Sequence, residues 1–316
     1  CDGYFPGHKV RVITHVHSDH LLGIEESIRD SDLICATPAT KDLLEVMRGL
    51  HPPQIITPNY KAPFSYEGDT ITLLPSEHIL GAAQVLVETQ NGDRYLYTSD
   101  FIYEKVQAMK CDILVLDATY GHPSCIRPPF NSVKQELINL VRSELENKNS
   151  IIFLGFYGKL QEVMGLLRQA KIEAPFINPP KVYSISKVYE KYRIPLGEFY
   201  LSTSKMGKKI LESQQYIGFY HPSFRPILQQ NTVFVHLTGW QFKTACRKIG
   251  PKEYILSFSG HSDFNQLIEY VKKSKPKLVI TDNARLGSAS RLAEEIKSRL
   301  NIEAKPEPTK NTFTRR

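Results

Sequence analysis

Short apolar runs rich in β-branched residues alternate with polar segments of helix length along this chain. From Asn131 onward the polar segments become longer, whereas the part before it consists mainly of short apolar runs. Helices between buried strands are typical of a parallel α/β layer. The pattern predicts strands at Lys9–Thr14, Ile71–Leu74, Gln84–Glu88, Arg94–Thr98, Asp112–Leu116, Ile151–Leu154 and Thr232–Val235, and helices near Ser132–Glu146 and Lys159–Ala170.

A break in this pattern divides the chain. His-Pro and Pro-Pro pairs between Gly121 and Pro129 interrupt it, which predicts the start of a second domain. After Pro251 the chain alternates strand, helix, strand and helix, and these elements can return to the first domain. They are expected at Tyr254–Phe258, Asp263–Lys272, Leu278–Thr281 and Ser288–Leu300. The Lys305–Arg316 tail is polar, and we expect it to fray.

Composition narrows the possible partners. The chain has 316 residues with 41% hydrophobic side chains, enough for a substantial core. Its 40 basic residues exceed its 33 acidic ones, and the net charge of +7 suits a polyanion, although solvated lysines alone would give the same balance. No apolar run approaches the ~18 residues that span a bilayer, and no leader precedes the first strand, so we expect no membrane partner.

The five cysteines, Cys1, Cys35, Cys111, Cys125 and Cys246, are scattered and form no Cys-x-x-Cys pair. Neither a disulfide framework nor a zinc ribbon is therefore indicated. Cysteines used in this way predict a reducing compartment, and we expect a cytoplasmic protein.

The densest chemistry follows the first predicted strand, where His15, His17, Asp19 and His20 lie in one short stretch. At a strand-to-helix turn, alternate residues can face one centre while the next two face a neighbouring centre. Imidazole with carboxylate suits Zn²⁺ or Mn²⁺. A group of surface histidines is the alternative, but it is less expected directly after an apolar strand.

Such a short stretch cannot complete two metal shells, so further ligands must come from other strand ends. His78 follows the strand Ile71–Leu74, and Asp100 ends the strand Arg94–Thr98. Alone, each would be read as a capping or surface residue. Together with the first stretch they predict a metal centre with one or two ions, Zn²⁺ first and Mn²⁺ or Mg²⁺ as alternatives.

The order His-x-His-x-Asp-His, a lone His, then a strand-end Asp resembles the metallo-β-lactamase fold. This resemblance implies an αββα sandwich of the α/β class. It also implies that Asp100 bridges two metal ions and that Asp2 matches the opening Asp, which steadies the ligand loop from behind.

Two later motifs resemble the β-CASP nucleases. One is Asp117-Ala118-Thr119-Tyr120-Gly121, and the other is the segment Ser257–Asp263. The resemblance implies an inserted α/β β-CASP domain over 123–250, with the metallo-β-lactamase domain over 1–122 and 251–316. It implies catalytic roles for Asp19, for His261 at the scissile phosphate and its leaving oxygen, and for Asp117, which orients His261. A histidine that merely precedes a helix is the alternative for His261.

Two smaller matches concern the substrate. Gly155-Phe156-Tyr157-Gly158-Lys159 ends a strand and opens a helix, where amides and a lysine can hold phosphate. The position of Gly158 and Lys159 resembles the phosphate-binding segment of the DNA-processing branches, the Artemis-like and the ligase-associated exonucleases. Thr238-Gly239-Trp240 resembles the Ser-Gly-Trp segment of the ligase-associated group.

The last motif departs from the family. RNA-processing members have a His ligand there and Artemis-like members a Val, whereas this chain offers Asp282. Asp282 could complete the shell of a second metal, or it could cap the following turn and leave that site weak. The departure leaves metal stoichiometry and the choice between DNA and RNA open.

These features predict a metal-dependent phosphodiesterase, most simply a DNA exonuclease acting on strand ends. RNA processing is the alternative enzyme, because its motifs are shared and the net charge suits either polymer. A non-catalytic nucleic-acid-binding subunit is the alternative from another class, but the intact set of ligands argues against it.

Overall fold

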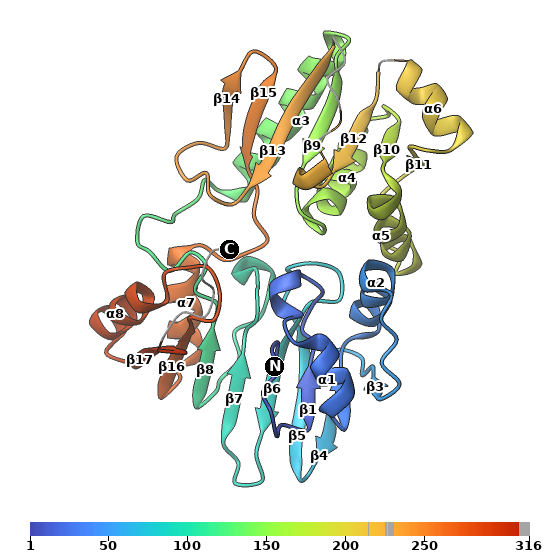
Figure 1. Cartoon of the computed structure of the whole chain (residues 1–316). Helices are drawn as coiled ribbons and strands as arrows, with labels where there is room; N and C mark the ends of the chain where they lie inside the picture. The colour runs from blue at the N-terminus through green and yellow to red at the C-terminus, as the bar shows by residue number, and fades with distance from the viewer. Residues whose placement is uncertain (214, 225, 227–230, 310–316) are drawn as a thin grey trace. The chain divides into compact units, whose positions relative to one another are not determined.

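The computed structural model describes residues 1–213, 215–224, 226 and 231–309. The chain divides into two compact units, one of Cys1–Ile126 with Gly260–Arg316 and one of Arg127–Ser259. The colours of Figure 1 show that the first unit contains both ends of the chain, blue to teal and then red. The first division falls in the proline-rich connection, close to the expected 122. The second falls after 259 and not at 250, because the strand Glu253–Ser257 pairs inside the second unit.

The first unit contains two sheets. In the larger sheet the strands lie in the order β17-β16-β8-β7-β6-β5-β4; β17, β16, β8 and β7 are parallel, and β6, β5 and β4 continue antiparallel. The smaller sheet has the order β1-β2-β3 and is parallel. The strands are β1 Val10–Val12, β2 Leu33–Cys35, β3 Ile55–Ile56, β4 Phe64–Tyr66, β5 Asp69–Pro75, β6 Ala83–Glu88, β7 Arg94–Tyr97, β8 Ile113–Leu116, β16 Leu278–Asp282 and β17 Glu303–Glu307.

Packing arranges this unit in four layers. The helices α7 (Phe264–Ser274) and α8 (Ala289–Leu300) bury their apolar faces on one side of the large sheet, against residues such as Leu114. The other side of that sheet packs on the small sheet, where Val12 contacts the β5–β6 core. On the outer side of the small sheet, Arg11 of β1 donates to Ser27 of α1 (Ile24–Asp30) at 2.8 Å. The predicted αββα sandwich is confirmed.

The remaining elements of this unit are α2 (Pro38–Arg48) and the 3-10 turns η1 (Ser18–His20) and η2 (Tyr103–Lys105). Thr37 caps α2, because its side chain accepts the amide of Thr40 at 3.1 Å, and Pro38 supplies a helical φ in the first turn. Gly49 ends the helix in the left-handed conformation. Local sequence thus fixes both ends of α2.

The second unit is one seven-stranded sheet in the order β11-β10-β12-β9-β13-β15-β14 (Figure 1). All its pairs are parallel except β14 with β15. The inserted α/β domain therefore has the expected class. Its elements are α3 Phe130–Glu146, β9 Ser150–Leu154, α4 Lys159–Gln169, β10 Phe176–Asn178, α5 Pro180–Lys191, β11 Phe199–Leu201, α6 Lys205–Glu212, β12 Ile217–Tyr220, η3 Pro222–Phe224, β13 Thr232–Thr238, β14 Cys246–Gly250 and β15 Glu253–Ser257.

One expectation for the C-terminus was wrong. Lys305 to Glu307 do not fray but belong to β17, whose backbone pairs with β16 at the edge of the large sheet. The alternation of polar and small residues there gave no strand pattern, and only pairing with β16 selects it. Residues 310–316 of that tail lie outside the described part of the chain.

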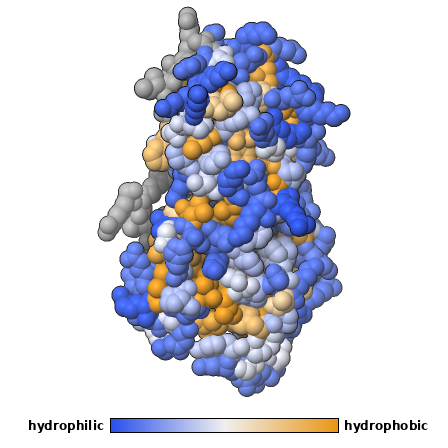
Figure 2. All heavy atoms as spheres, turned by 90° about the vertical axis from the view of Figure 1, so that its right-hand side faces the viewer, coloured by the Kyte–Doolittle hydropathy of each residue, from blue (hydrophilic) through white to orange (hydrophobic). Residues whose placement is uncertain are grey.

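Among the described residues, no helix is both long and apolar enough to cross a membrane. Figure 2 shows a face on which hydrophilic residues predominate and hydrophobic residues lie both singly and in small patches. Scattered exposed apolar residues are normal for a globular surface and carry no argument by themselves.

Candidate metal centre

The loops that follow β1, β5 and β7 in the first unit bring together side chains that can bind a metal ion. His15 and His17 follow β1, His78 lies between β5 and β6, and Asp100 follows β7. Backbone hydrogen bonds tie these loops to each other: Ala83 donates to the Thr14 carbonyl and Ile102 to the Ser76 carbonyl, both at 3.0 Å. The predicted ligands of three separate segments therefore meet at one place.

Four of the distances within this group are close to those between the ligands of a tetrahedral ion. His17 Nδ1 lies 3.2 Å from His15 Nε2 and 3.1 Å from His78 Nε2. Asp100 Oδ2 lies 3.5 Å from the Nε2 atoms of both His15 and His78. A tetrahedral Zn²⁺ with its usual bond lengths holds its ligand atoms about 3.3–3.6 Å apart. The four residues therefore fit a divalent ion.

Hydrogen bonds behind the ligands fix which ring nitrogen faces the centre. His78 Nδ1 lies 2.7 Å from the carbonyl oxygen of Gly260, which can only accept, so Nδ1 carries the proton and Nε2 keeps its lone pair. His15 Nδ1 lies 3.2 Å from Thr14 Oγ1, a hydroxyl that itself donates to Asp2. Both Nε2 atoms are thus prepared to bind a metal.

The ionisation states agree with this geometry. Burial lowers the pKa of His15 and of His78 well below the usual value, so both rings are neutral. Burial alone would raise the pKa of Asp100, but the facing rings of His20 and His261 outweigh it and hold that pKa well below the usual value. Neutral imidazoles and an ionised carboxylate are the forms that bind metal ions.

The backbone is strained next to two of the ligands. Ser99, directly before Asp100, has φ of +51°, and Glu77, directly before His78, has φ of +59°. Non-glycine residues rarely adopt this region, and such outliers concentrate at functional sites. Here the strained turns direct Asp100 and His78 toward the centre.

A second group of possible metal ligands contains Asp117, His261 and Asp100, which it shares with the first group. His261 Nδ1 lies 3.1 Å from Asp117 Oδ2, and His261 Nε2 lies 3.7 Å from Asp100 Oδ2. The amide and hydroxyl of Thr119 donate to Asp117 Oδ1 at 2.8 and 2.7 Å. Asp117 is therefore held in place to orient the His261 ring.

The chain after His261 is anchored to the loop of Asp100. Ser262 donates to the Phe101 carbonyl through its amide at 2.8 Å and through its hydroxyl at 2.9 Å. The next residue, Asp263, forms a capping box with Gln266 at the start of α7. These bonds set His261 beside the metal ligands.

His20 and Asp19 lie next to the centre but in neither group. His20 Nε2 lies 3.3 Å from Asp100 Oδ2 and 3.5 Å from Asp19 Oδ2, and its Nδ1 lies 2.8 Å from Asp2 Oδ2. Asp2 also accepts the amide of Thr14 at 2.9 Å. Asp2 thus holds both ends of the His15–His20 stretch, in the supporting position that the resemblance implies.

Asp282 is not brought into either group of the described residues. Its Oδ1 accepts the amide of Ala284 at 2.9 Å, and its Oδ2 pairs with the guanidinium of Arg285. Of the two roles open to Asp282, the geometry favours the cap of the following turn. The sequence did not point to Arg285 or to the Gly260 carbonyl as parts of the site. The one available signal was the position of Arg285 soon after an Asp at the end of a strand.

Gly158 and Lys159 lie in the second unit, at the turn from β9 into α4. Gly158 has φ of +93°, and its amide donates to Gln161 Oε1 at 2.8 Å. The amide of Gly158 is therefore already used, so of the two predicted residues Lys159 is the one left to contact a phosphate. Thr238 is the last residue of β13, the strand beside β9, and Gly239 and Trp240 follow it; Trp240 is 51% exposed.

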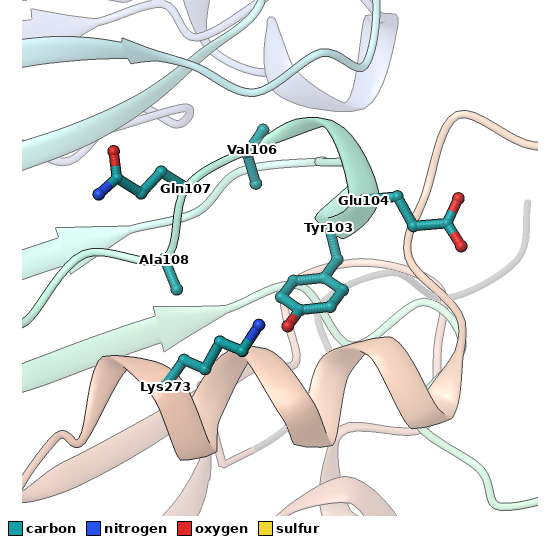
Figure 3. Close-up of a pocket in the computed structure, with 6 residues that line it drawn as sticks. All are labelled: Tyr103, Glu104, Val106, Gln107, Ala108 and Lys273. Carbon is teal, nitrogen blue, oxygen red and sulfur yellow. The ribbon is translucent and has the colours of Figure 1, made fainter.

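A separate pocket of about 440 Å³ opens elsewhere in the first unit, between η2 and α7 (Figure 3). The Tyr103 ring and the Lys273 ammonium face each other there, with 5.2 Å from Nζ to the ring centre. None of the predicted ligands lines it, so we do not connect it with the metal centre.

The chain is similar to a number of known proteins, among them the following three. A probable DNA ligase of Opitutus terrae is 23% identical over 308 residues, covering 94% of this chain and 28% of that protein. The DNA cross-link repair protein SNM1 of Arabidopsis thaliana is 22% identical over 326 residues, covering 92% and 63%. An RNase J-like protein of Methanocaldococcus jannaschii is 24% identical over 338 residues, covering 85% and 80%. The chain thus spans less than two thirds of the first two relatives.

The chain is also similar to a solved structure, and part of it matches a domain family. A protein of unknown function from Enterococcus faecalis V583 has a similar fold, with a TM-score of 0.59 at 15% identity over 87% of this chain and 75% of that one. Residues 248–305 match the family described as the Zn-dependent metallo-hydrolase RNA specificity domain. With its sandwich, inserted domain and these relatives, the chain belongs to the β-CASP nuclease family of the metallo-β-lactamase fold.

Proposed function

We propose that this chain is a metal-dependent nuclease that hydrolyses phosphodiester bonds at the ends of DNA strands. The observation that carries the proposal is the convergence of His15, His17, His78 and Asp100 at tetrahedral spacing, with His261 beside them. Zn²⁺ is the ion we expect first, and Mn²⁺ or Mg²⁺ are the alternatives.

The four ligands would hold the ion, and Asp100 would connect it to the group of His261. A bound divalent ion would supply Lewis-acid activation of water and neutralise charge on the phosphate. His261 is placed to move a proton: Asp117 takes the hydrogen bond from Nδ1, and Nε2 faces the site. A ring that carries both protons can give the one on Nε2 to the departing oxygen.

The preference for DNA ends rests on the second unit. Lys159 begins α4, where the helix dipole favours an anion, and its Nζ lies 5.9 Å from the centre of the Phe156 ring. We propose that Lys159 binds a terminal phosphate and that the exposed Trp240 lies along the bound DNA strand. The net charge of +7 suits such a polyanion.

RNA cleavage is the second candidate function. It is favoured by the match of residues 248–305 to a domain described by RNA specificity. The metal ligands would act identically on either polymer, since a phosphodiester is common to both.

One experiment separates these functions. The purified protein is incubated with matched DNA and RNA strands labelled at either end, with and without a 5′ phosphate, in Zn²⁺, Mn²⁺ or Mg²⁺. Stepwise shortening of DNA, faster from a phosphorylated end, is the expected result. Shortening of RNA alone would select the second candidate, and intact strands in every metal would reject both.

A further inference from the structure

Arg285 is a buried cation beside the metal ligands. It lies just after β16, and its side chain is 12% exposed. Its guanidinium pairs with Asp282 Oδ2, its Nε lies 3.7 Å from Asp19 Oδ2, and its Nη2 donates to the Asp2 carbonyl at 3.3 Å. Three segments of the first unit thus converge on one positive charge.

The same acidic side chains are the ones that a second metal ion would need. The resemblance to two-metal enzymes assigns that ion to Asp19, His20 and the shared Asp100, with a fourth ligand from the last motif. Here the last motif provides Asp282, whose two oxygens are engaged by Arg285 and by the Ala284 amide. Neither group of converging ligands among the described residues includes Asp19, His20 or Asp282. The first metal position fits an ion, and the position at Asp19, His20 and Asp282 does not.

We propose that the chain holds one tightly bound divalent ion, at His15, His17, His78 and Asp100, and that Arg285 provides a fixed positive charge in place of a second ion. The proposal rests on the metal-dependent function above. It concerns what the acidic side chains of Asp19 and Asp282 bind, not whether a metal is bound.

Charge balance explains why the arrangement is stable. A buried guanidinium needs anionic partners, and Arg285 has one carboxylate at each end, from Asp282 and Asp19. A guanidinium keeps its proton in proteins, so the positive charge of Arg285 is permanent. A second divalent ion at this position would have to displace the guanidinium. If it did not, repulsion between the two positive charges would weaken its binding.

The test counts metal ions. Metal-free protein is titrated with Zn²⁺ in a calorimeter, and bound metal is measured after dialysis by elemental mass spectrometry. Wild type is expected to hold one equivalent. Arg285→Gln frees Asp19 and Asp282, and we expect it to bind a second equivalent at least tenfold more tightly than wild type. Arg285→Lys, which keeps the charge, and Arg291→Gln, which removes an exposed arginine of α8, should both remain at one.

A spectroscopic readout supports the count. Loaded with Mn²⁺, wild type should give the electron paramagnetic resonance spectrum of an isolated ion, and Arg285→Gln that of a coupled pair. Two tightly bound equivalents in wild type, or one in both proteins, would overturn the inference. No bound equivalent in wild type would instead overturn the metal-dependent function.

A second variant covers the case in which Arg285→Gln does not fold. Asp282→Asn keeps the side chain's shape and lies outside the four-ligand site. If Asp282 is no ligand, this variant binds its single ion with wild-type affinity. A tenfold or greater loss of Zn²⁺ affinity would show that Asp282 is a ligand and would contradict the proposal.

Discussion

At the scale of single residues, hydrogen bonds to neighbouring groups fix the orientation of three histidines of the site. His78 relies on the Gly260 carbonyl, His261 on Asp117, and His20 on Asp2. The ligand types and their order along the chain could be predicted, because metal ions select few residue types. The partners could not, since a backbone carbonyl or a buried arginine has no characteristic spacing.

Replacement of His261 tests its part in proton transfer. His261→Ala should lower turnover by ~10² or more, the effect of losing a positioned acid or base, while bound metal is retained. Turnover on a labelled strand and metal content are measured on the same preparation. His122→Ala is the matched control, because His122 is exposed and its ring lies 2.7 Å from the hydroxyl of the nearby Ser124.

Two outcomes would contradict the assignment of His261. Full turnover in His261→Ala would make the residue structural. Loss of metal would make it a ligand.

At the scale of elements, the site depends on loops that start at strand ends and are bonded to one another. The strands β1, β5, β6, β7 and β8 could be predicted because their apolar runs are short and rich in β-branched or aromatic residues. Short elements such as β3, with two residues, and β14, with a mainly exposed pattern, carry too little periodicity to be recognised. Their pairing partners, not their own sequences, define them.

The contact between the β5–β6 loop and the start of α7 can be tested without deleting a ligand. A Cβ on Gly260 would meet His78 Nδ1 at 2.7 Å and the His78 carbonyl at 3.2 Å, so Gly260→Ala must shift the ring. We expect Zn²⁺ affinity to fall about 10- to 100-fold, as for other changes behind a metal ligand. Competition with a chromogenic chelator measures this loss.

Gly165→Ala is the control for that experiment. Its new Cβ would have only the Pro195 carbonyl nearby, at 3.7 Å, which is ordinary contact. Equal Zn²⁺ affinity in Gly260→Ala and wild type would mean that the Gly260 carbonyl does not position His78.

The turn from β9 into α4 carries the prediction of end recognition. Lys159→Ala should weaken binding of 5′-phosphorylated DNA more than of 5′-hydroxyl DNA, by about 1.5–3 kcal/mol, the range for a hydrogen bond to a charged group. Affinities for both ends are measured at two salt concentrations. Lys205→Ala, another lysine at the first position of a helix, serves as the control.

A lysine that merely follows the strand backbone would behave differently. Lys159→Ala would then weaken both ends equally and reduce the salt dependence. Equal losses would therefore end the hypothesis that Lys159 recognises a terminal phosphate.

At the scale of the whole molecule, the chain inserts one α/β unit into another. The first boundary could be predicted from the prolines near Pro128. The second could not, because the apolar run of β15 fits either sheet, and its pairing with β13 is what places it in the second unit. Non-local pairing of this kind leaves no mark on the local sequence.

Metal removal should lower the thermal stability of the first unit more than that of the second. An ion that binds only the folded first unit stabilises it by about 4 kcal/mol at a thousandfold excess over Kd. The one tryptophan, Trp240, lies in the second unit and reports on that unit. A chelator should lower a calorimetric melting transition more than it lowers the transition seen by tryptophan fluorescence. Identical calorimetric melting with and without chelator would contradict a metal centre in the first unit.

The most direct measurement compares cleavage of a labelled DNA strand by metal-free protein, by the same protein after Zn²⁺ or Mn²⁺ is added, and by His17→Ala under both conditions. His51→Ala, which changes an exposed histidine of the same unit, is the matched control. We expect cleavage only in metal-loaded wild type and His51→Ala, with His17→Ala folded but inactive. Cleavage that persists without metal, or undiminished cleavage by His17→Ala, would contradict it.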